Sequence, residues 1–134
     1  MSYINMNQNS SYNFKAPNIA ADADKKIEVV FPTQEALAPA VAAATAVEIN
    51  RQTTVIDLGE LAANITLNAT LGTDLERGAI ITVKAKSDGT ARSVTFGDGF
   101  TAPAVAGTIS KTKVVSLIYD GASFLPMAAA VQID

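Results

Sequence analysis

Carboxylates are the side chains of this sequence with the most scope for catalysis, because it contains no Cys and no His. That absence excludes structural zinc sites, cysteine nucleophiles and Ser-His-Asp triads. The candidate carboxylates are the pairs Asp57 with Glu60 and Asp74 with Glu76, and the single residue Asp98. Carboxylates in predicted turns are usually solvated or bonded to local backbone amides. A glycosidase would also need an aromatic-lined cleft, and the chain has no Trp and only 6% aromatic residues. We therefore predict that the protein is not an enzyme and needs no cofactor.

Two short Gly-Asp stretches bear on ion binding, Asp88-Gly89-Thr90 and Gly97-Asp98-Gly99. An EF-hand needs acidic or Asn residues at alternate positions and a closing Glu, and neither stretch has this spacing. No phosphate-binding GxxxxGK[ST] motif is present either. We therefore predict no metal site, and the alternative that stays open is a calcium site at the surface.

Aromatic residues beside predicted turns are the candidates for sugar binding. Phe100, Tyr119 and Phe124 have this placement, and exposed rings there would suit a lectin-like site. The alternation of residues around Phe96 and Phe124 instead favours a place in the core or in a subunit seam for these two.

The charge balance argues against nucleic-acid and membrane partners. Ten Lys and Arg residues face thirteen Asp and Glu residues, for a net charge of −3, and no window is strongly basic. The longest mostly apolar run, Leu37–Val47, is too short to span a bilayer. No signal peptide is recognisable at the N-terminus. We expect a soluble protein made in a cytoplasm.

Alternating apolar and polar residues predict a chain of short β-strands. In the run NITLNATL, Ile65, Leu67 and Ala69 share one face of a strand, while Thr66 and Asn68 share the other. The run AIITVKAK repeats this pattern, with its lysines facing solvent. The predicted strands are residues 27–31, 53–58, 64–71, 79–86, 93–96, 113–119 and 123–133.

Turn signals between these strands predict how they connect. Ser87-Asp88-Gly89-Thr90 and Tyr119-Asp120-Gly121-Ala122 each hold an Asp-Gly pair, which is typical of a β-hairpin. Residues 33–45 have the highest helix propensity in the chain, with Pro39 leaving room for one short helix or none. No repeat of fixed period is recognisable. The predicted fold is all-β, an antiparallel β-sandwich or jelly roll with an extended N-terminal arm.

The first 24 residues differ from the rest of the chain in composition and in hydrophobic pattern. Asn is frequent there, and the apolar residues follow neither a helical nor a strand period. We therefore predict two parts: residues 1–24, an attachment arm that orders on a neighbouring subunit, and residues 25–134, the β-domain. The predicted anchors of the arm are Tyr3, Ile4, Met6, Tyr12, Phe14 and Ile19.

Residues 77–131 carry a recognisable order of parts. A GAIITVKAKSDG hairpin is followed by an SVTFGDGF turn, a small-residue loop and a KVVSLIYDGASF hairpin. This order resembles the β-rich modules of bacteriophage tail-fibre, head-fibre and capsid-decoration proteins. The resemblance implies a virion protein that oligomerises, commonly as a homotrimer, and attaches through its N-terminal segment to another virion component.

Heptads, collagen-like Gly-X-Y triplets and long β-helical repetition are missing from the sequence, which argues against a fibre shaft. We therefore expect a non-enzymatic capsid decoration (cement) or head-fibre protein. Its expected partners are its own copies and the major capsid protein or another virion protein. The alternative is a receptor- or glycan-binding module of a tail fibre or spike, with binding through Phe100 or Tyr119.

Overall fold

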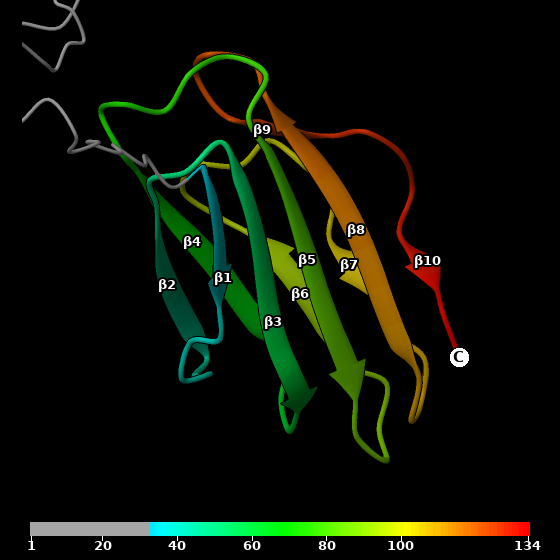
Figure 1. Cartoon of the computed structure of the whole chain (residues 1–134). Coiled ribbons are helices and arrows are strands. Elements are labelled where there is room, and N and C mark those ends of the chain that lie inside the picture. Colours follow the sequence, from blue (N-terminus) through cyan, green and yellow to red (C-terminus); the bar gives the residue numbers. More distant parts are fainter. Residues whose placement is uncertain (1–32) are drawn as a thin grey trace, which may run out of the picture. The chain divides into compact units, whose positions relative to one another are not determined.

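Two β-sheets packed face to face make up residues 33–134, the part of the chain that the computed structural model describes (Figure 1). The strands are β1 (Gln34–Leu37), β2 (Ala44–Ile49), β3 (Thr53–Leu61), β4 (Ile65–Leu71), β5 (Ile80–Ser87), β6 (Ser93–Phe96), β7 (Val105–Ala106), β8 (Thr112–Tyr119), β9 (Phe124–Pro126) and β10 (Val131–Gln132). The all-β sandwich expected from the sequence is confirmed. The predicted strand at residues 27–31, the arm and the boundary after residue 24 lie outside the described residues.

The chain passes back and forth between the two sheets. Sheet A has six strands, in the order β1-β3-β5-β8-β10 with β9 also on β8, and sheet B has the order β2-β4-β6-β7. The first six strands thus alternate between the sheets and form three stacked rungs: β1 with β2, β3 with β4, and β5 with β6. Each rung lies on the next one in register, as in Gln34 opposite Thr53 and Ala44 opposite Thr66.

This path corrects the expected antiparallel pairing and the jelly-roll alternative. The pairs β1–β3, β3–β5, β2–β4 and β4–β6 are all parallel. The Asp88-Gly89 stretch was predicted to close a hairpin, but β5 and β6 belong to different sheets, so it carries the chain from one sheet to the other. The second Asp-Gly turn is a true hairpin, because β8 and β9 pair antiparallel with Tyr119 opposite Phe124.

Residues 33–45, the segment with helix propensity, form β1 and the start of β2 instead of a helix. Pro39 removes a backbone donor in the middle of the segment and interrupts a helix there. Pairing with β3 and β4 gives the flanking amides and carbonyls long-range partners. Helix propensity is worth only tenths of a kcal/mol per residue, so this tertiary pairing outweighs it.

The core lies between the two sheets and follows the predicted alternation. Ile65, Leu67 and Ala69 of β4 are buried, and so are Ile81 and Val83 of β5. The intervening residues of β5, Thr82, Lys84 and Lys86, point away from the core, as predicted. Because each rung adds inward side chains from both sheets, the core extends from rung to rung.

Asparagine side chains tie one rung of sheet B to the next. Asn68 accepts a hydrogen bond from the backbone N–H of Asp98 through Oδ1, at 2.8 Å, and Asn64 accepts one from Ser93 at 3.0 Å. Gly97 stands beside the amide of Asn68, where a Cβ atom would overlap Oδ1. Asn50 stands beside Gly72 in the same way. These Asn–Gly pairs fix the register of the stacked rungs.

Candidate assembly surface

Two of the carboxylates considered for catalysis, Asp57 and Glu60, form hydrogen bonds or ion pairs with neighbouring residues of the fold. Asp57 accepts hydrogen bonds from the Gly59 amide at 2.9 Å and from Lys84 Nζ at 3.2 Å. The Gly59 bond, with help from Lys84, lowers the pKa of Asp57. Glu60 pairs with Lys86 at 3.4 Å. A carboxylate held ionised in this way is a poor general acid.

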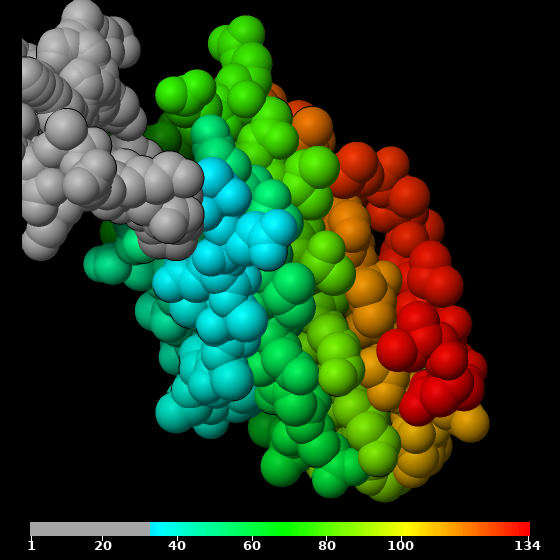
Figure 2. Space-filling model, in the orientation of Figure 1, coloured from blue at the N-terminus to red at the C-terminus, as the bar shows by residue number. Residues whose placement is uncertain are grey.

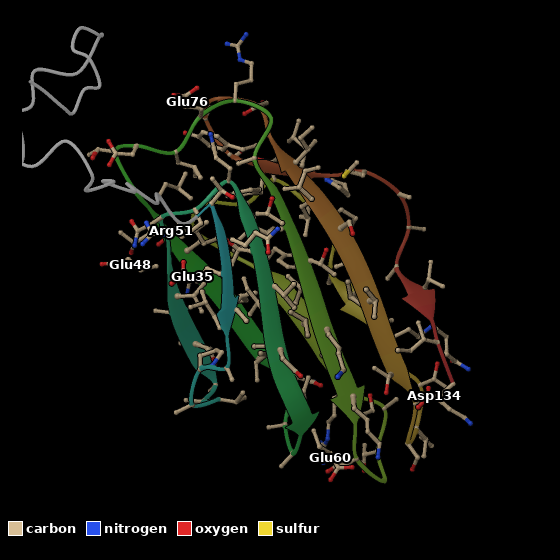
Figure 3. All side chains as sticks on the ribbon, in the orientation of Figure 1. Glu35, Glu48, Arg51, Glu60, Glu76 and Asp134 are labelled. Atoms are coloured by element: carbon tan, nitrogen blue, oxygen red, sulfur yellow. The ribbon has the colours of Figure 1, made fainter. Side chains whose placement is uncertain are left out.

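Asp74, Glu76 and Asp98, the other predicted carboxylates, are exposed side chains of the connecting loops. Figure 3 places Glu76 at the opposite end of the long strands from Glu60. The structure therefore does not bring the carboxylates together into one cleft. Within residues 33–134, no cluster of three or more potential metal ligands occurs.

Asp88 of the first Asp-Gly stretch is bound by a guanidinium. Arg92 donates from Nε to Oδ1 at 2.8 Å and from Nη2 to Oδ2 at 2.7 Å, and Thr90 donates its amide to Oδ1 at 2.9 Å. The Arg92 contact, followed by the Thr90 amide, lowers the pKa of Asp88. This bidentate pair holds the connection from β5 to β6.

The aromatic rings considered for sugar binding pack on one another. Phe124 is completely buried, and Phe96 and Phe100 are each 9% exposed. Ring centroids lie 4.9 Å apart for Phe96 and Phe100 and 5.2 Å apart for Tyr119 and Phe124. The core position predicted for Phe96 and Phe124 is confirmed, and the exposed ring expected at Phe100 is wrong. Tyr119 is half-buried, and its hydroxyl donates to the carbonyl of Gly121 at 3.0 Å.

The outer faces of the two sheets differ in character. On sheet B the outward residues of β4 and β6 are polar: Thr66, Asn68, Thr70, Ser93 and Thr95. The outward residues of sheet A include a row of apolar side chains across three strands, Ile80 opposite Ile118 and Ile118 opposite Leu125. Antiparallel and mixed sheets with one solvated face normally carry polar residues there, as β4 and β6 of sheet B do; β2 of that sheet exposes Ala44, Ala46 and Glu48.

Further apolar side chains extend this outer face of sheet A. Val55 on β3 is 43% exposed, and Val131 on β10 is 59% exposed opposite Val114 of β8. Ile133 follows Val131 along the same edge and is 58% exposed. Figure 2 shows the strands of sheet A at the surface, from β1 in cyan to the C-terminal segment in red. The ion pairs Lys84–Asp57 and Lys86–Glu60 mark the charged end of this face. We call this surface the sheet A face: it comprises the apolar residues Val55, Ile80, Ile118, Leu125, Val131 and Ile133, with the two ion pairs at its charged end.

A groove opens between the sheets beside β7 and residues 128–130, which precede β10. Its volume is about 260 Å³, and its walls are mainly small apolar residues, among them Ala104, Val105, Pro126 and Ala129. Lys113 is the charged residue in its wall.

Sequence reasoning missed the sheet A face because its residues come from strands far apart in the chain. The signal available was the apolar identity of outward positions, such as Val55 between Thr54 and Ile56. The predicted arm anchors Tyr3, Ile4, Met6, Tyr12, Phe14 and Ile19 lie outside the described residues. No part of residues 33–134 forms a helix of the length and hydropathy needed to cross a bilayer.

Comparison with protein-family models, with curated proteins and with solved structures found no match for this chain. The fold by itself defines a β-sandwich of two mixed sheets in which the first six strands stack as three rungs.

Proposed function

We propose that this chain is a non-enzymatic structural protein of a bacteriophage virion, a capsid decoration or head-fibre protein that assembles as a homotrimer. The observation that carries the assembly part is the contrast between the exposed apolar side chains of the sheet A face and the polar outward residues of β4 and β6 in sheet B. An exposed apolar patch on a soluble domain marks a surface that another molecule covers. The virion assignment rests on the resemblance of residues 77–131 to phage β modules.

The mechanism is mechanical. Three β-domains pack around a symmetry axis through the sheet A face, and the arms, residues 1–24, lie across neighbouring capsid subunits. Apolar surface buried at about 25 cal/mol per Å² opposes rupture of the shell, before the entropy lost on association is subtracted. The stacked rungs suit a load-bearing knob, because parallel backbone pairing joins neighbouring rungs in both sheets.

The assembly part is tested by the solution mass of the full chain from light scattering. A homotrimer has a mass of about 42 kDa, three chains of 13.9 kDa. The variant Val55→Lys/Val131→Lys places two charges on the sheet A face and is expected to be monomeric. Its matched control, Thr70→Lys/Thr95→Lys, adds the same charge to the outer face of sheet B and is expected to stay trimeric.

A wild-type chain that is monomeric at all concentrations contradicts the homotrimer. If the sheet A variant is still a trimer and the control is a monomer, the interface lies on the outer face of sheet B instead.

The attachment part is tested on virus particles. A chain that starts at Lys25 is expected to keep the far-ultraviolet circular dichroism of the β-domain and to lose co-sedimentation with particles of the virus that encodes it. Full occupancy of particles by the truncated chain contradicts attachment through the arm.

A further inference from the structure

The groove beside β7 is opened by a bulge at the edge of sheet A. From Pro126 to Val131 the edge advances five residues, whereas β8 advances only three, from Leu117 to Val114. Residues 127–130 hold the excess, and Figure 1 shows the chain between β9 and β10 curving away from β8. Bulges are common at sheet edges and beside active sites, where they re-aim side chains or end the pairing of strands.

The groove that this bulge opens has apolar walls. Phe96 of β6 and Val115 of β8 line it from the two sheets, and both are buried. Its other apolar walls are Ala, Pro and Val side chains of residues 102–106 and 128–130, with Pro126. A volume of about 260 Å³ is just below the roughly 300–1,000 Å³ of pockets for drug-sized ligands. The groove therefore suits a small ligand whose apolar part is removed from water.

Lys113 brings a positive charge to the inner side of the sandwich. It is opposite Ala85 of β5 and shares a face of β8 with Val115 and Leu117, which are buried in the core. Its side chain therefore points into the space between the sheets, where it is half-buried in the wall of the groove. The three ion pairs of residues 33–134 do not include it. A cation beside apolar walls is stabilised by an anion that binds in the same place.

The charge in the groove selects the kind of anion. A single ammonium provides one positive charge, which matches a monovalent carboxylate. Phosphate and sulfate groups have more acceptor oxygens, and proteins usually bind them with several donors at once, such as Arg forks or rows of backbone amides. An inorganic anion would also leave the apolar walls in contact with water. The matching ligand is therefore an amphiphile with an alkyl chain and one carboxylate.

The size of the groove favours a small molecule over a folded partner. Twelve residues line the groove, whereas a stable protein interface takes about 20–30 residues on each side. Phe96 and Val115 are buried residues of this lining, so contact with them requires a ligand thin enough to enter between the sheets.

We propose that this groove binds a small amphiphilic monocarboxylate, with the alkyl chain against Phe96 and Val115 and the carboxylate accepting hydrogen bonds from Lys113 Nζ. The proposal goes beyond the virion assignment and does not rest on it, because the groove lies within one β-domain.

Titration of the full chain with sodium octanoate tests the proposal, with 1-octanol as the uncharged probe of the same length. Calorimetry is expected to show one octanoate bound per chain. Two-dimensional ¹H–¹⁵N spectra are expected to shift most at residues 104–106, 113 and 128–130. Octanol is expected to bind at the same residues at least about 10-fold more weakly, because it offers Lys113 no charged partner.

Three variants separate the effect of charge from the effect of shape. Lys113→Met keeps an unbranched side chain and removes the ammonium, so octanoate should bind about 10-fold to 100-fold more weakly while the affinity for octanol is unchanged. The matched control Lys111→Met removes the same charge outside the groove and should leave both affinities unchanged. Ala129→Leu narrows the groove and should weaken the binding of both probes. Far-ultraviolet circular dichroism of each variant verifies that the β-domain is folded.

Absence of octanoate binding overturns the proposal, and so does binding that Lys113→Met leaves unchanged. Equal affinity of the native chain for octanol and octanoate also overturns it. Shifts confined to the sheet A face, around Ile118 and Val131, overturn it as well, since the probe then adsorbs on the outer apolar surface. None of these outcomes depends on trimer formation or on attachment to particles, so the proposed function stands or fails separately.

Discussion

The register of the stacked rungs in sheet B can be tested by a double-mutant cycle at Asn68 and Gly97. Asn68 Oδ1 accepts the Asp98 amide at 2.8 Å, and loss of one such bond costs about 1 kcal/mol. In Gly97→Ala the added Cβ overlaps Oδ1, so the Asn68 side chain must turn away and lose the same bond. Thr66 Cγ2, at 3.1 Å from that Cβ, must also shift slightly. Gly97→Ala is therefore expected to cost about 1–2 kcal/mol.

In the second arm of the cycle, the destabilisation caused by Gly97→Ala is expected to disappear. In the Asn68→Ala background the obstruction is gone, and Gly→Ala substitutions at compatible sites stabilise by about 0.4–1 kcal/mol through the unfolded chain. Gly97→Ala should then change stability by less than about 0.5 kcal/mol, which gives a coupling energy of about 1 kcal/mol.

Urea unfolding followed by far-ultraviolet circular dichroism measures these differences, because the chain has no Trp for fluorescence. A change of 1 kcal/mol moves the midpoint by roughly 0.3–1 M urea. Gly89→Ala is the control, since a Cβ there has no neighbour within 4 Å, and it should be neutral or slightly stabilising. Additive effects of Asn68→Ala and Gly97→Ala would refute the proposed contact between these two residues.

Three further predictions concern the core and the turns. Gly107→Ala would place a Cβ against the backbone carbonyl of Arg92, which cannot move aside cheaply, so the melting temperature should fall by several degrees; an unchanged value contradicts this packing. Phe124→Ala removes a fully buried ring and should cost about 3–5 kcal/mol in urea unfolding, whereas a surface ring would cost less than about 1 kcal/mol. Arg92 lowers the pKa of Asp88, and a backbone amide of β8 lowers the pKa of Asp134. The two ionised carboxylates therefore stabilise the folded state fully above the ordinary pKa of 3.8, and this contribution is lost as the pH falls through their lower folded pKa values. Asp88→Asn should therefore flatten the acid loss of stability in melts between pH 5 and pH 2, and an unchanged acid profile would show that the pair is unimportant.

Local patterns of the sequence predicted β3, β4, β5, β6 and β8, and the inward faces of β4 and β5. Residues 65, 67 and 69 were predicted to share a buried face, and they do, because side chains alternate along a strand whatever its partner is. The hairpin at Asp120-Gly121 was predictable for a similar reason, since the turn and both strands lie within a few residues of one another.

Only the tertiary structure decided which strands pair. Alternation gives a strand its two faces but does not name its neighbour, so Asp88-Gly89 looked like a hairpin while in fact it joins two sheets. Residues 33–45 became strands because β3 and β4 offer backbone partners that no local propensity reveals. The sheet A face has the same origin: Val55, Ile118 and Val131 are far apart in sequence, and long-range pairing alone places them on one surface.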